Sequence, residues 1–242
     1  MTFQENDVDY EDGRLACRGL VIRDATHPSQ RPGVVLFPDA RGIGDTAKSY
    51  ARRLAERGYA VFIADLYGHG LFTDDLPRAR ELMTALRSDV ERWRERGRAA
   101  LEAAANLRAV EPTRMVAVGY CFGGQTALEL GRSGADLAAI VSFHGGLSSP
   151  RPQDAARLRA RVLACHGGAD PLVPPAQVTE FVSHMGRAPV SWELQVYARA
   201  LHGFTNPELV AAAPPGHGYD AEADERSRRA TIELLDEAFE RG

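Results

Sequence analysis

The sequence predicts an α/β fold, in which a mostly parallel central sheet carries helices on both faces and has an antiparallel edge at the N-terminus. Three observations predict it. The chain has 242 residues, 44% of them hydrophobic and 26% charged, as in a globular protein with a sizeable core. Short apolar runs of strand length alternate with segments of helical periodicity. The first apolar run, 15–22, has little helical signal before it, which favours a ribbon at the sheet edge.

Local signals then place each element in turn. A strand over 33–37 and a loop over 38–44 precede a helix that is capped by Asp45 and stopped by Gly58. The remaining elements follow the same alternation of patterns. The expected strands are 60–65, 115–119, 137–143, 161–165 and 192–197, and the expected helices are 76–86, 90–107, 122–132, 176–185 and one that runs through 230–239.

The chain is predicted to form a single domain over 1–242. It contains no internal repeat and no low-complexity linker. The longest segment without a strand signal is about 66–107, and its pattern predicts helices. We expect this segment to supply a helical wall or lid beside a ligand pocket.

Composition excludes several classes of function. The formal net charge is −4 and the arginines are scattered among acidic residues, so a nucleic-acid partner is not expected. No apolar run approaches the roughly 18 residues of a membrane span, and no secretory signal is visible. The three cysteines match neither a disulfide framework nor a short metal motif. A cytoplasmic protein is expected, a monomer or homodimer that binds a small molecule and needs no metal or cofactor.

The most informative segment is 119–124, with the sequence GYCFGG. It follows a predicted strand and opens a predicted helix, and it fits a nucleophile elbow with Cys121 in the nucleophile position. Glycines are needed there because a Cβ near so tight a turn would collide with its neighbours. The dipole of the following helix favours a thiolate. The alternative is a buried structural cysteine in a glycine-rich turn.

Two further residues fall where such a nucleophile needs them. Asp170 follows the strand that ends at Cys165, and His202 follows the strand that ends at Tyr197. The chain order of nucleophile, acid and base is that of the α/β-hydrolase fold, and all three lie at strand carboxyl ends. Taken singly, Asp170 also fits a turn or helix cap, and His202 a surface histidine.

On these residues the sequence resembles the dienelactone hydrolase family, which includes the carboxymethylenebutenolidases, within the α/β-hydrolase superfamily. The resemblance extends from about the first ribbon to the C-terminus. It implies that Cys121 is the nucleophile, His202 the base and Asp170 the group that orients the imidazole. It also implies an oxyanion hole formed by the backbone N–H of Phe122 and one from the loop at Ala40.

The sequence departs from the family pattern at three places. Asp39 stands where type members carry a glutamate that helps to switch the thiol to thiolate, and Asn206 stands where they carry an arginine for a substrate carboxylate. His144 replaces a pocket tyrosine, and it is either a pocket residue or a structural histidine. Arg41 could bind an acidic substrate or pair with Asp39. These four residues are the candidate substrate-binding residues.

The function expected from this pattern is a cysteine-dependent hydrolase of a small lactone, enol ester or activated ester, acting through a thioester acyl-enzyme. One alternative keeps the scaffold and the cysteine but changes the reaction to that of a lyase, isomerase or acyltransferase. Another is a ligand-binding protein without turnover.

Overall fold

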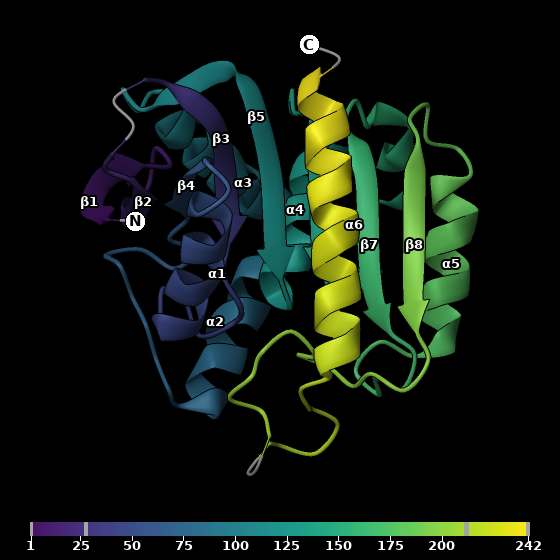
Figure 1. The fold of residues 1–242 in the computed structure, drawn as a ribbon. Helices are drawn as coiled ribbons and strands as arrows, with labels where there is room; N and C mark the ends of the chain where they lie inside the picture. The colour runs from purple at the N-terminus through teal and green to yellow at the C-terminus, as the bar shows by residue number, and fades with distance from the viewer. Residues whose placement is uncertain (1, 27–28, 211–212, 241–242) are drawn as a thin grey trace. The chain divides into compact units, whose positions relative to one another are not determined.

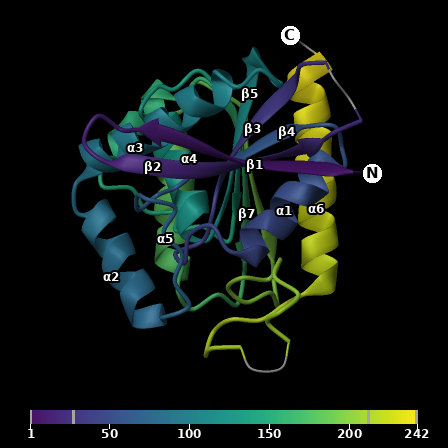
Figure 2. The same ribbon diagram turned by 90° about the vertical axis from the view of Figure 1, so that its left-hand side faces the viewer.

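The computed structural model describes residues 2–26, 29–210 and 213–240. The chain divides into two compact units, 1–118 and 119–242. Both are built from strands and helices that alternate along the chain, as drawn in Figure 1 and, turned by 90°, in Figure 2. The strand β5 (Val110–Tyr120) carries the chain from the first unit into the second.

In the first unit the strand order is β1-β2-β4-β3. The strands β3 and β4 are parallel, whereas β2 pairs antiparallel with both β1 and β4. The helix α1 packs on β4 and β2, and α3 packs on β3 and β1, so this part of the sheet has helices on both faces (Figure 2). The elements are β1 (Phe3–Glu11), β2 (Ala16–Asp24), β3 (Arg31–Phe37), α1 (Asp45–Ala55), β4 (Ala60–Ile63), α2 (Leu76–Arg87) and α3 (Val90–Ala105).

The expected antiparallel edge is confirmed, and the partner strand of the predicted ribbon is β1. Its residues pair in register with β2 from Phe3 opposite Asp24 to Glu11 opposite Ala16. The expected cap of the first helix is wrong. Asp45 is the first residue of α1, and the N-cap is Gly44, which has no side chain with which to cap the helix. The negative charge of Asp45 still interacts favourably with the positive N-terminal end of the helix dipole.

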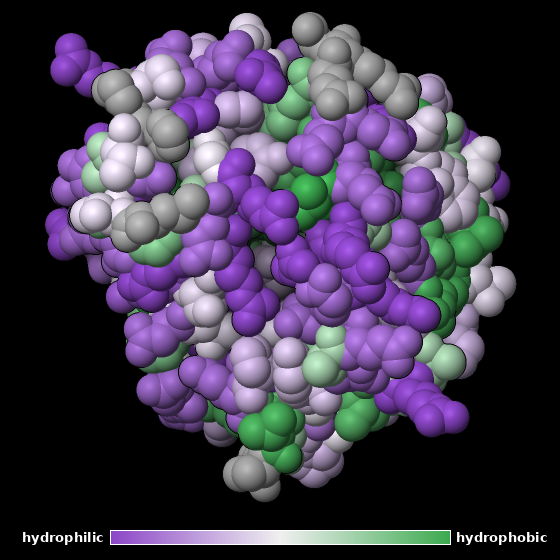
Figure 3. Space-filling model, in the orientation of Figure 1, coloured by the Kyte–Doolittle hydropathy of each residue, from purple (hydrophilic) through white to green (hydrophobic). Residues whose placement is uncertain are grey.

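In the second unit β6, β7 and β8 run parallel in that order. The helix α6 packs on β6 and β7, while α4 packs on β6 from the other face (Figures 1 and 2). The outward side of α6 is mainly hydrophilic (Figure 3). The elements are α4 (Phe122–Arg132), β6 (Ala139–Phe143), the 3-10 helix η1 (Pro152–Arg157), β7 (Arg161–Gly167), α5 (Pro175–Met185), β8 (Trp192–Tyr197) and α6 (Ala221–Glu240).

The elements of this unit lie close to their predicted positions. The helix α4 and the strand β8 have the predicted bounds, and β7 runs two residues past its predicted end to Gly167. The main difference is η1, a 3-10 helix in a segment expected to be a loop. A proline in its first turn suits a short helix, because that position needs no backbone donor.

A buried carboxylate organises the loop that follows β4 in the first unit. Asp65 is 1% exposed, and its two side-chain oxygens accept four backbone N–H bonds of 2.7 to 3.0 Å, from Arg18 and Gly70 on one oxygen and Tyr67 and Gly68 on the other. A carboxylate can accept at both oxygens, whereas an amide side chain cannot. The loop therefore depends on an acid at this position.

Replacing Asp65 by asparagine is expected to destabilise the protein by about 3 kcal/mol, because the amide NH2 would face two backbone donors and leave them without an acceptor. Urea unfolding measures the change. Asp89→Asn is the matched control, since Asp89 is an exposed N-cap that accepts from Glu91 and Arg92 and asparagine caps a helix equally well. Equal stabilities of the two variants would contradict the assigned role of Asp65.

Candidate active site

The strand β5 leads directly into Cys121, and the helix α4 begins at the next residue. Cys121 has φ 54° and ψ −118°, a backbone conformation that is rare for a residue with a side chain. Its carbonyl accepts hydrogen bonds from the N–H groups of Gly124 and Gln125 in the first turn of the helix. The turn has the strained strand-to-helix geometry of a nucleophile elbow, as the sequence predicts. The Cys121 side chain is half-buried.

The elbow requires glycines because neighbouring atoms lie too close to its backbone to leave room for a Cβ. A Cβ on Gly119 would lie 2.0 Å from the carbonyl oxygen of Gly123, and one on Gly124 would lie 2.6 Å from the hydroxyl of Ser142. A Cβ on Gly145, in the loop after β6, would come within 2.5 Å of the same hydroxyl. The backbone of the elbow therefore sits directly against β6 and the residues that follow it.

Asp170 lies in the tight turn that follows β7. Its backbone N–H donates to the carbonyl of Gly167, and its Oδ1 accepts the N–H of Leu172 at 2.8 Å. The other carboxylate oxygen, Oδ2, lies 2.8 Å from Nδ1 of His202. The side chain of Asp170 is fully buried, so the carboxylate is fixed by the turn on one side and by the imidazole on the other.

His202 lies in the loop after β8, which folds back on itself beside the ring. The N–H of His202 donates to the carbonyl of Gly216, and its own carbonyl accepts from the N–H of Gly218. The ring of His217 meets the His202 ring edge to face, with centroids 5.0 Å apart. Backbone bonds on both sides of the residue therefore hold the imidazole in place.

The three predicted residues meet in one chain of contacts. Nε2 of His202 lies 3.1 Å from Sγ of Cys121, while its Nδ1 faces Asp170. Burial lowers the pKa of His202, but the charge of Cys121 and the hydrogen bonds from Asp170 and Cys121 outweigh it, and the pKa is raised to about 10. The arrangement favours a protonated His202 imidazole at neutral pH, facing the sulfur of Cys121.

The other two thiols have different surroundings. Cys17 and Cys165 are buried in β2 and β7. Desolvation raises the pKa of the Cys17 thiol to about 11 and that of the Cys165 thiol to about 12. Both therefore remain protonated at neutral pH.

His144 lies next to the elbow, at the end of β6, and it is buried. Its Nδ1 accepts the backbone N–H of Cys121 at 3.2 Å, and its Nε2 lies 2.9 Å from the hydroxyl of Thr205. The ring packs edge to face against those of His202 and Phe204, each with centroids 5.3 Å apart. The sequence analysis singled out His144 but missed Thr205, for which the sequence offers no signal beyond its place three residues after His202.

The remaining candidates for substrate binding stay predictions. Asn206 is buried, and its side-chain oxygen accepts the N–H of Glu208 at 3.0 Å. In the first unit Arg41 pairs with Asp39 at 3.5 Å and with Asp74 at 3.6 Å. The ion pair with Asp39, which the sequence analysis gave as the alternative to substrate binding, is therefore present.

The two predicted oxyanion donors belong to different units. Phe122 is the first residue of α4, where helix N–H groups have no acceptor within the helix itself. Ala40 lies in the first unit, where its carbonyl accepts the hydroxyl of Tyr67 at 2.9 Å. The role of the Ala40 N–H stays a prediction.

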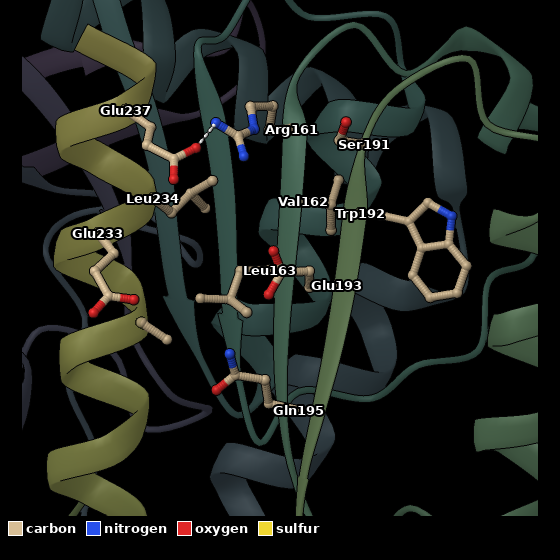
Figure 4. A pocket seen from close by; sticks show the side chains of 11 residues that line it. Arg161, Val162, Leu163, Ser191, Trp192, Glu193, Gln195, Glu233, Leu234 and Glu237 are labelled. Atoms are coloured by element: carbon tan, nitrogen blue, oxygen red, sulfur yellow. Dashed lines mark hydrogen bonds and ion pairs between the residues drawn. The ribbon is translucent and has the colours of Figure 1, made fainter. Parts of the chain in front are cut away.

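A separate groove of about 110 Å³ lies between α6 and the strands β7 and β8 (Figure 4). Arg161 and Glu237 form an ion pair across it, and Glu193 and Glu233 also line it. None of the predicted site residues lies there. Within the described parts of the chain, no cluster of three potential metal ligands occurs, and no helix is long and apolar enough to span a membrane.

Comparisons with known proteins identify the family of the chain. The model of the dienelactone hydrolase family matches residues 18–239. The solved structure of m3DLH is 41% identical and superimposes with a TM-score of 0.94, covering 98% of this chain and 99% of that one. A dienelactone hydrolase-like promiscuous phosphotriesterase from metagenomic libraries is 38% identical, with a TM-score of 0.92 over the same shares.

A curated relative, the uncharacterized protein K02A2.1 of Caenorhabditis elegans, is 36% identical over 146 residues, which are 58% of this chain and 90% of the relative. The family match spans most of the sequence, and the two solved structures cover nearly all of it. The predicted α/β-hydrolase fold is thereby confirmed, and the chain belongs to the dienelactone hydrolase family of hydrolases.

Proposed function

We propose that this hydrolase opens small lactones, enol esters or similarly activated esters through a thioester on Cys121. The observation that carries the proposal is the position of the His202 ring, with Nε2 3.1 Å from Sγ of Cys121 and Nδ1 2.8 Å from Asp170. A nucleophile beside a base that is itself oriented by an acid is the arrangement that acyl transfer requires.

In the first half of the proposed reaction the thiolate attacks the carbonyl carbon and forms a C–S bond. The carbonyl oxygen takes the negative charge, and the backbone N–H of Phe122 stabilises it. The C–O bond to the leaving oxygen then breaks, and Nε2 of His202 gives its proton to that oxygen. The result is a thioester, a free alcohol or enol group and a neutral imidazole.

In the second half the neutral His202 takes a proton from water, and the hydroxide attacks the thioester carbonyl. The C–S bond breaks, the carboxylic acid leaves, and the thiolate and imidazolium are restored. Asp170 holds the imidazole in the tautomer that presents Nε2 to the sulfur in both halves. A thiolate leaves more readily than an alkoxide, so attack is productive mainly on substrates with good leaving groups. Lactones with enol oxygens and activated esters meet this condition.

A second candidate activity is the hydrolysis of phosphotriesters. It is favoured by the 38% identity to the promiscuous phosphotriesterase, which extends over 98% of the chain. The same thiolate would attack phosphorus in place of carbon and expel a phenolate. Water activated by His202 would then cleave the P–S bond, release the phosphodiester and restore the thiolate.

A panel of lactones, enol esters and one p-nitrophenyl phosphotriester, assayed in H2¹⁸O, tests these proposals. Hydrolysis must place one solvent oxygen in the released acid, and mass spectrometry of the protein quenched during turnover is expected to show the acyl group on Cys121. Products without solvent oxygen would instead indicate a lyase, isomerase or acyltransferase. Turnover of the phosphotriester alone would favour the second candidate.

A further inference from the structure

His144 contacts two parts of the site whose relative position matters for the proposed reaction: the backbone of Cys121 and the loop that carries His202. Its Nδ1 accepts the backbone N–H of Cys121 at 3.2 Å, a hydrogen that is shared with the carbonyl of Phe143 at 3.0 Å. Its Nε2 lies 2.9 Å from the hydroxyl of Thr205. One imidazole thus bridges the nucleophile's own backbone and the loop that carries His202.

The hydrogen bonds fix the protonation state of this ring. A nitrogen that accepts an N–H cannot carry a proton, so Nδ1 is bare and the single ring proton of the neutral form is on Nε2, which donates to Thr205. Burial, together with the charges of His202 and His217, lowers the pKa of His144 well below its usual range. His144 therefore stays neutral while the neighbouring His202 is an imidazolium.

The backbone of His144 is also held in an uncommon conformation, with φ 39°. Its N–H donates to the carbonyl of Cys165 at 2.8 Å, and its ring packs edge to face against the rings of His202 and Phe204. Such strain persists only where the surroundings over-determine the conformation. The ring thus has a fixed position from which to hold its two partners.

We propose that His144, through its hydrogen bond to Thr205, is a positioning residue that sets the distance between the Cys121 sulfur and the His202 imidazole. The role differs from that of a substrate-binding residue, because both ring nitrogens are occupied by the protein. The inference rests on the proposed function for its effect on turnover, but its effect on the pair itself needs no substrate.

Two substitutions test the link. Thr205→Val removes the hydroxyl and keeps the branched shape, and His144→Asn keeps an acceptor near the Cys121 N–H but is too short to reach Thr205. Asparagine is also tolerated at positive φ. Both variants are expected to lower kcat about tenfold, with KM within about twofold of the wild-type value, because the loss is one of alignment and not of binding.

The decisive readout is the rate at which iodoacetamide alkylates Cys121 as a function of pH. The titratable groups around the pair and His144 are Tyr120, His166, Asp170 and His217. In both variants the His144–Thr205 hydrogen bond is lost, so the His202 imidazolium is held less closely to the Cys121 sulfur. The alkylation profile is therefore expected to move to higher pH. A purely structural role would lower the melting temperature and leave this profile in place.

Thr231→Val is the matched control. Thr231 is buried in α6, and its hydroxyl donates to the carbonyl of Ser227 at 2.8 Å, so the substitution removes a comparable hydroxyl away from the site. Thr205→Ser, which restores the hydroxyl, is expected to return the alkylation profile toward that of the wild type. An unchanged profile in both Thr205→Val and His144→Asn, or an equal shift in Thr231→Val, would overturn the inference. Full activity of a Cys121→Ala protein would refute the proposed function. The alkylation profiles of the His144 and Thr205 variants would still test the inference, because they need no substrate.

Discussion

Replacing Cys121 by alanine is expected to reduce kcat by at least about 10⁴-fold while the protein remains folded. In the proposed reaction the substitution removes the sulfur that forms the acyl bond, and the residual rate would come only from binding and oxyanion stabilisation. Alanine is smaller than cysteine and the side chain is half-buried, so the stability should change little. Steady-state kinetics on the best substrate of the panel, with circular dichroism as the check on folding, measure the effect.

Cys17→Ala is the matched control, because it removes a thiol that is buried in β2 of the first unit. It is expected to retain activity. Retention of full activity in Cys121→Ala would rule out this sulfur as the nucleophile, and equal loss in both variants would point to a general effect of losing a thiol.

The second large effect is expected from Asp170→Asn. The amide leaves the size of the side chain unchanged but removes the charge that faces Nδ1 of His202 at 2.8 Å. We expect kcat to fall by about 10²- to 10⁴-fold, since the imidazole is no longer held in the required tautomer. The variant also tests the electrostatics of the site through its pH profile.

The pH dependence follows from the direction of the shift. The pKa of His202 is raised to about 10, so the proton that must reach the leaving group is present below that pH and lost above it. In the wild type kcat/KM is expected to fall as the pH rises through about 10. Without the Asp170 charge the pKa of His202 should drop. The alkaline limb of the kcat/KM profile should then shift to lower pH by about one pH unit or more.

Asp136→Asn is the comparison for this experiment, because Asp136 is an exposed aspartate of the same unit. It is expected to leave both kcat and the alkaline limb as in the wild type. An alkaline limb that stays in place in Asp170→Asn would mean that this carboxylate does not set the charge of the base.

The sequence predicts most of the fold and the three residues that meet at the site, and the reason is that their signals are local. The elbow needs glycines within two or three positions of Cys121, and Asp170 and His202 each follow a short predicted strand. Parallel strands place such residues at one edge of a sheet. Their order along the chain then selects the fold.

Other features could not be predicted because they depend on contacts between distant segments. The role of His144 depends on the direction of its ring and on a hydroxyl 61 residues away. The strand β1 is mostly exposed and rich in acids, so it lacks the apolar run that marks β3 and β4. The cap at Gly44 left no signal, since glycine has no side-chain oxygen of the kind that marks an N-cap in a sequence.

The burial of Cys17 and Cys165 has a practical consequence. Each of these sulfurs is withdrawn from solvent and kept protonated at neutral pH, while Cys121 alone sits beside a positive ring. A thiol reagent added at neutral pH should therefore count functional molecules in a preparation, one label for each competent chain, without any engineered tag.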